Sequence, residues 1–143
     1  MIGGGGTHPS SLQNTEILDL DGTSKYGPSL PWKFYGHCAV MMSATYVILV
    51  GGTFRPKSTL IFDVFNFEAK FEGPKLLGGG RSGAACAHIV HNNGSNYVVV
   101  AGGDRHTTSE PLDTTEILIV NEYDISQSKW ITGKYKVINN QNS

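Results

Sequence analysis

The sequence predicts an all-β domain built from a structural repeat of about 50 residues. Two apolar phrases ending in Gly-Gly recur, and each is followed, after a polar loop, by a second apolar run. The first segment is 46–52, and its second run is 59–64. The other segment is 97–103, and its second run is 115–120. A partial copy opens the chain, with four glycines and then TEILDL at 15–20. The second glycine of each pair falls at Gly6, Gly52 and Gly103, spaced 46 and 51 residues apart.

The composition supports this fold class and excludes some classes of binding partner. The chain has 143 residues and a net charge of -1, so it holds one domain at most and has no strong field to attract nucleic acid or an anionic membrane surface. Its 18 glycines are nearly twice the usual share, as suits a turn-rich β fold. No run approaches the roughly 20 apolar residues that span a bilayer. We therefore expect neither a nucleic-acid nor a membrane partner.

Short apolar runs bounded by Gly, Pro, Asn and Ser predict β-strands, and helical periodicity is scarce. The strands are expected at 15–20, 36–42, 46–50, 59–65, 83–90, 97–101, 115–120 and 129–137. The runs YVILV and YVVVA are apolar at every position, so both faces of each strand should be covered. Propeller blades meet this requirement, because each blade is sandwiched between its neighbours.

The two full copies combine a glycine pair after an apolar strand, an aspartate beside an aromatic residue, and a later aromatic residue on a fourth strand. This pattern resembles the kelch repeat. The third copy is the fullest and has Arg81-Ser82-Gly83, Gly102-Gly103, Tyr123-Asp124 and Trp130. The second has Gly36-His37, Gly51-Gly52, Phe62-Asp63 and, two residues late, Phe71. The first keeps its glycines, Asp19 and Tyr26 but lacks its opening strand.

The resemblance implies a partial kelch-type β-propeller of antiparallel four-stranded blades, with two full blades and one incomplete. The expected boundaries are a partial blade at about 1–33, full blades at about 34–77 and 78–138, and a tail at 139–143. Such a set cannot close a ring. We expect the sequence to be a fragment of a larger propeller; a homodimer completing a six-blade ring and an open arc are the alternatives.

No catalytic or metal-binding pattern stands out, so we expect no catalytic residue, no metal and no cofactor. The five histidines lack the spacing of metal ligands, and His37 is expected to pack as a structural residue. The glycine run 3–6 lacks the Gly-Lys-Ser/Thr of a phosphate loop. Arg81 should bond loop carbonyls. The aspartates recur with the repeat and should support turns: Asp19, Asp63 and Asp124.

Cys38 and Cys86 lie in successive repeats but are offset by one residue when counted from Gly36 and Gly83. Because one residue of offset turns a strand side chain to the opposite face, the sequence predicts no disulfide between them. Two buried thiols are expected instead. They slightly favour a reducing, cytoplasmic compartment over an oxidising one.

A hairpin is expected between 83–90 and 97–101, because Asn93-Gly94 is a strong turn signal. Asn93-Gly94-Ser95 also fits an N-glycosylation sequon, which matters only if the chain is extracellular. The turn is the simpler explanation of these residues.

The kelch resemblance implies a protein–protein interaction module that binds through inter-strand loops on one rim. The loops 53–58 and 104–113 follow the glycine pairs, and variable polar loops of a repeat often share the binding face. Contacts to an unidentified protein partner are expected from Arg55, Lys57, Arg105, His106 and Glu110. The alternative is a fragment of a propeller-fold enzyme, galactose-oxidase-like or sugar-processing, which would need a catalytic cluster near the axis.

Overall fold

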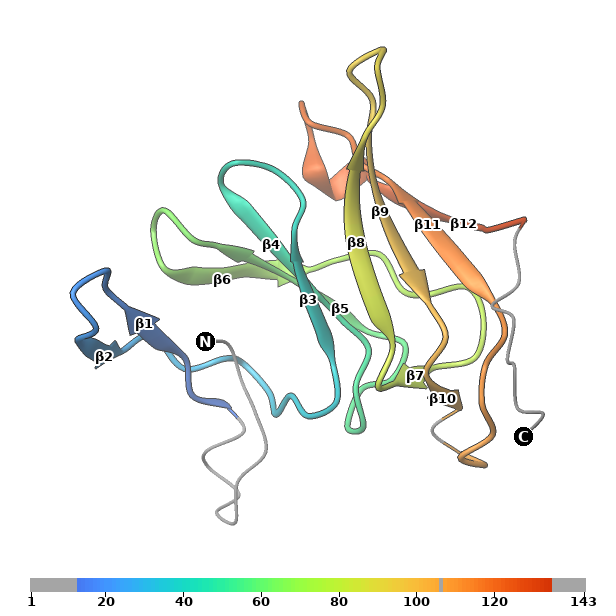
Figure 1. Ribbon diagram of the computed structural model, residues 1–143, viewed down its shortest axis with the longest axis horizontal. Coiled ribbons are helices and arrows are strands. Elements are labelled where there is room, and N and C mark those ends of the chain that lie inside the picture. Colours follow the sequence, from blue (N-terminus) through green and yellow to red (C-terminus); the bar gives the residue numbers. More distant parts are fainter. Residues whose placement is uncertain (1–12, 106, 135–143) are drawn as a thin grey trace.

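The computed structural model describes residues 13–105 and 107–134 (Figure 1). Two four-stranded antiparallel sheets dominate it. Sheet I contains β3 (Cys38–Met41), β4 (Tyr46–Val50), β5 (Thr59–Asp63) and β6 (Glu68–Glu72). Sheet II contains β8 (Ala85–Val90), β9 (Asn96–Ala101), β11 (Thr115–Ile119) and β12 (Lys129–Thr132). The expected all-β class with four-stranded antiparallel sheets is confirmed.

Two short ladders and one helical turn complete the described part. One ladder pairs β1 (Glu16–Leu18) with β2 (Ser24–Tyr26), and the other pairs β7 (Arg81–Ser82) with β10 (Asp104–Arg105). The 3-10 helix η2 (Ile125–Gln127) precedes β12. Every expected strand has a counterpart, although the end of 129–137 lies outside the described residues, as does the glycine run 3–6. The two-residue strands β7 and β10 were not expected, because polar loop segments form them.

Each four-stranded sheet is a meander in which strands that follow one another pair edge to edge. Strands β3 and β4 are joined by a tight hairpin in which Met42 N–H donates to Tyr46 O at 2.8 Å. Strands β8 and β9 are joined by the expected hairpin, closed by His91 N–H donating to Ser95 O at 2.8 Å. The fourth strands β6 and β12 carry the aromatic residues Phe71 and Trp130.

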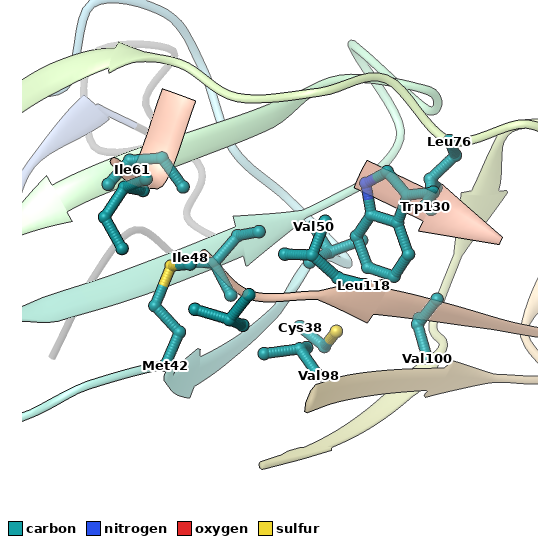
Figure 2. Packing of buried hydrophobic residues seen from close by; sticks show 12 residues of the cluster. Cys38, Met42, Ile48, Val50, Ile61, Leu76, Val98, Val100, Leu118 and Trp130 are labelled. Atoms are coloured by element: carbon teal, nitrogen blue, oxygen red, sulfur yellow. The ribbon is translucent and has the colours of Figure 1, made fainter. Parts of the chain in front are cut away.

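The main core fills the space between the two sheets (Figure 2). Ile48, Val50 and Ile61 of sheet I pack in one cluster with Leu118 and Trp130 of sheet II. The indole Nε1 of that tryptophan donates to the carbonyl of Pro74, at the exit of sheet I, at 2.8 Å. The two sheets are therefore joined by apolar burial and by a directed hydrogen bond.

Sheet I is covered on its second face as well. Val47, Leu49, Leu60 and Phe62 form a separate buried cluster with Leu30 and Phe34, from the segment before β3. Strands β4 and β5 are consequently buried on both faces, as the unbroken apolar run of β4 predicts. In sheet II only alternate residues of β9 and β11 are fully buried, since its second face is open.

The two cysteines form a disulfide between β3 and β8, with Cα atoms 6.0 Å apart. The expectation of two unpaired thiols is wrong, and the bonded cysteines no longer favour a reducing compartment. Cys38 stands opposite Val50, the residue before the glycine pair, whereas Cys86 stands opposite Val100, one position further back. The offset does turn the side chains to opposite faces. Consecutive sheets meet through opposite faces, however, so the offset brings both sulfurs into the interface.

The glycine pairs that end β4 and β9 serve two needs at once. Gly51, Gly52, Gly102 and Gly103 all have positive φ, between 66° and 101°. A Cβ on Gly103 would also lie 2.6 Å from the carbonyl oxygen of Ser82. A side chain at these sites is therefore excluded by backbone conformation and, at all but Gly102, by the approach of a neighbouring backbone or side chain.

Arg81 is buried at the base of sheet II and makes an ion pair with the buried Glu116, at 2.9 Å. Its guanidinium also donates to the carbonyl oxygens of Gly102 and Thr114, both at 3.1 Å. The expectation that this arginine bonds loop carbonyls is confirmed. Glu116 in turn accepts the backbone N–H of Leu77 at 2.6 Å, so one buried pair ties the segment between the sheets to β11.

Candidate partner-binding rim

The loops that follow the two glycine pairs lie on the same edge of the molecule, the lower edge in Figure 1. The segment 73–80 connects the two sheets and reaches this edge where it enters β7 (Figure 1). Leu76 N–H donates to Lys57 O at 3.0 Å, and Arg81 N–H donates to Pro56 O at 2.9 Å. The β7–β10 ladder then sets Arg105 opposite Arg81. We name the surface formed by three segments the rim; its described residues are 53–58, 73–80, and 104–113 without residue 106.

The three rim segments enclose an open cavity of about 410 Å³. Four cationic side chains line it, and none of the described lining residues is acidic. The four come from all three segments: Arg55, Lys57, Lys75 and Arg105. We call this the basic cavity. Three of the five residues expected from sequence to contact a partner are thus brought together.

The other two expected contacts do not line the basic cavity. Glu110 is exposed, and its carboxylate lies 4.0 Å from the Nε of Arg105. Its backbone oxygen also accepts the Arg105 N–H at 2.8 Å, so Glu110 steadies the short β10 turn. His106 lies outside the described residues.

Aromatic side chains adjoin the cationic ones. The guanidinium of Arg55 lies 4.4 Å from the centre of the Trp32 ring, and that ring stacks on Phe34 at 5.9 Å. The cation–π contact holds a long side chain against a fixed platform. Phe54 is 53% exposed beside it, and Tyr35 is 50% exposed. The rim therefore presents cations together with exposed aromatic surface.

Sequence reasoning missed Lys75 and the aromatic platform. Lys75 follows Gly73-Pro74, at the exit of sheet I. The topology predicts the position of Lys75. In an antiparallel four-stranded meander the second and fourth strands run in the same direction, so the loop after the second strand and the exit after the fourth lie at the same edge. Trp32 lies between repeats, where no motif marks it.

The recurring aspartates support turns, in part as expected. Asp63 Oδ1 accepts the backbone N–H groups of the residues two and three positions later, both at 2.9 Å. Asp124 caps η2 by accepting Ser126 N–H at 3.0 Å. Asn121, which the sequence pattern did not single out, makes the same pair of bonds as Asp63, both at 3.1 Å. At Asp19 the backbone oxygen, rather than the side chain, closes the turn by accepting Gly22 N–H at 3.0 Å.

Other expected features can be placed as well. The His37 ring packs edge-on against Phe34 at 5.2 Å, in keeping with a structural role. Among residues 13–105 and 107–134, no three or more His, Cys, Asp or Glu side chains gather in one group that could hold a metal ion. The same residues contain no helix long and apolar enough to cross a membrane.

No protein-family model matches this chain, and no curated protein matches it. The kelch resemblance therefore rests on the repeat itself.

Proposed function

We propose that this chain is a kelch-type propeller segment and that its rim binds an acidic segment of a protein partner. The observation that carries the proposal is the basic cavity, in which four cationic side chains from three separate segments surround one hollow without an acidic residue among its described lining. Like charges gathered around a hollow repel one another, and a bound anion relieves that repulsion.

The arrangement of the two sheets supports the propeller part of the proposal. Both are four-stranded meanders, and they pack face to face around one core. The residues of sheet I that sheet II covers are Ile48, Val50 and Ile61. Their repeat equivalents in sheet II are Val99, Ala101 and Ile117, all only partly buried. The open face of sheet II is therefore equivalent to the face of sheet I that packs against sheet II, and a further blade could cover it in the same way.

The chemistry of the rim favours a protein segment that bears carboxylates. Arginine binds carboxylates in a two-pronged geometry, and two of the four cations are arginines. Exposed Phe54 and Tyr35 lie near the platform of Trp32, and aromatic residues and arginine are enriched at the energetic centres of protein interfaces. We expect the partner to combine acidic residues with an apolar or aromatic one.

Fluorescence anisotropy with a labelled, aspartate- and glutamate-rich peptide tests the proposal, with the matching Asn/Gln peptide as the uncharged control. We expect the acidic peptide alone to bind, and binding to weaken as salt is added, because exposed charges are screened. The double variant Arg55→Glu/Arg105→Glu should abolish binding.

The matched control is Lys25→Glu/Lys129→Glu, which makes the same change in net charge at exposed sites on β2 and β12, outside the basic cavity. It should bind the peptide nearly as well as the wild type. Equal losses in the two double variants would mean that net charge, rather than the cavity, attracts the peptide.

A further inference from the structure

The disulfide between Cys38 and Cys86 changes what the Asn93-Gly94-Ser95 sequon means. Disulfides form and persist in oxidising compartments and are rare where thiols are kept reduced. In a eukaryotic cell the oxidising compartment is the secretory pathway, where asparagine glycosylation also takes place. We propose that this chain is processed there and that Asn93 is an N-glycan acceptor.

The position of Asn93 suits a bulky modification. It is the only Asn-x-Ser/Thr site in the 143-residue sequence, and it lies in the β8–β9 hairpin, which projects beyond the rest of the molecule at the top of Figure 1. Asn93 and Gly94 are exposed, and Ser95 is half-buried. A glycan there would extend into solvent on the edge opposite the basic cavity, so it would leave the rim uncovered.

The geometry of the side chain leaves the reacting atom available. The Oδ1 of Asn93 accepts the Ser95 N–H at 3.0 Å and lies 3.1 Å from the Nδ1 of His91. Both contacts use the oxygen of the amide, whereas a glycan is attached through Nδ2. The folded hairpin can therefore keep its hydrogen bonds with the sugar in place.

The covalent step needs a co-reactant, a lipid-pyrophosphate-linked oligosaccharide. Nδ2 of Asn93 forms a bond to the anomeric carbon of the first sugar. The bond between that carbon and the pyrophosphate oxygen breaks, the lipid pyrophosphate leaves, and one amide proton passes to solvent. The disulfide forms when two thiols give up two protons and two electrons to a disulfide-bearing oxidoreductase, which is thereby reduced.

The test expresses the full chain behind a cleavable signal sequence in cultured eukaryotic cells. Its mobility is compared before and after treatment with peptide N-glycosidase, an enzyme that leaves aspartate where a glycosylated asparagine stood. We expect the wild type to shift and Asn93→Gln not to shift. Asn92→Gln is the matched control, because it alters the neighbouring exposed asparagine but leaves the sequon intact, so it should shift like the wild type.

Ser95→Ala gives an independent check. It removes the sequon but keeps the Ser95 backbone N–H that bonds Asn93, so the hairpin should fold while the glycan is lost. Thiol labelling without reductant should find both cysteines blocked in every variant. A wild-type chain without a glycan overturns the proposal, as does a glycan that persists in Asn93→Gln. Free cysteines in the processed wild type would overturn the argument from compartment.

Discussion

At the scale of single residues, the buried pair of Arg81 and Glu116 is the site where one substitution should do most damage. Arg81→Met leaves the Glu116 carboxylate buried without its partner, which typically costs about 3–5 kcal/mol. Adding Glu116→Gln removes the stranded charge and keeps an acceptor for the Leu77 N–H. We expect urea unfolding to show a large loss for the single variant and a clear recovery for the double variant. A double variant less stable than the single one would contradict this account.

Acid should act on the fold partly through Asp63. The backbone N–H of Asn66, with further bonds from the Asn66 side chain and the Phe65 N–H, lowers the pKa of this carboxyl below its usual range. The folded pKa is thus below the unfolded one, so Asp63 contributes stability that is present above about pH 4 and is lost as pH falls through the folded pKa. Asp63→Asn should therefore show a shallower loss of unfolding free energy on acidification. Parallel pH profiles for the two proteins would exclude Asp63 as a source of acid sensitivity.

At the scale of elements, the disulfide links the first strands of two successive sheets. It closes a loop with a sequence separation of 48, for which the chain-entropy treatment gives a stabilisation of about 4 kcal/mol. We expect Cys38→Ala/Cys86→Ala to unfold at clearly lower denaturant concentration than the oxidised wild type. Reducing the wild type should move its midpoint toward that of the variant, and a midpoint insensitive to reductant would show that the bond is absent or without effect.

The elements also show how far sequence reasoning reaches. The strands of the meanders can be predicted, because β4 and β9 contain the apolar runs YVILV and YVVVA, bounded by turn residues. The ladder of β7 and β10 could not be predicted, since it is made of polar residues whose pairing depends on how two sheets meet. The Cys38–Cys86 bond was missed for the same reason. The one-residue offset was interpreted within a single sheet, and only the face-to-face packing of two sheets gives it its meaning.

The candidate site could likewise be predicted only where the repeat places its residues. Arg55, Lys57 and Arg105 come from loops that the repeat places at equivalent positions, so their shared rim followed from the repeat alone. Lys75 and the Trp32 platform come from connections between repeats, where no periodic signal exists. That the cationic side chains surround one hollow depends on three-dimensional contacts such as Arg81 N–H to Pro56 O.

At the scale of the whole molecule, sheet II has an open apolar face. This face includes Val99, Ala101 and Ile117, which are only partly buried. The equivalent residues of sheet I are buried, because sheet II covers them. Partly exposed apolar surface of this kind promotes association. We expect sedimentation of the isolated chain to show mass rising with concentration, and Ile117→Lys to suppress the rise with little change in unfolding midpoint. A wild type that stays monomeric at every concentration would mean that the open face is not adhesive.

The central claim is that the rim, through its basic cavity, is the binding surface. The most direct test is to titrate the acidic peptide into isotope-labelled protein and to follow the backbone amide signals by NMR. The account predicts that the signals which shift belong to the rim, at Arg55, Lys57, Lys75, Gly79 and Arg105. Signals of the opposite edge, at the β3–β4 and β8–β9 hairpins, should stay in place. Shifts confined to those hairpins, or spread evenly over the molecule, would contradict the claim.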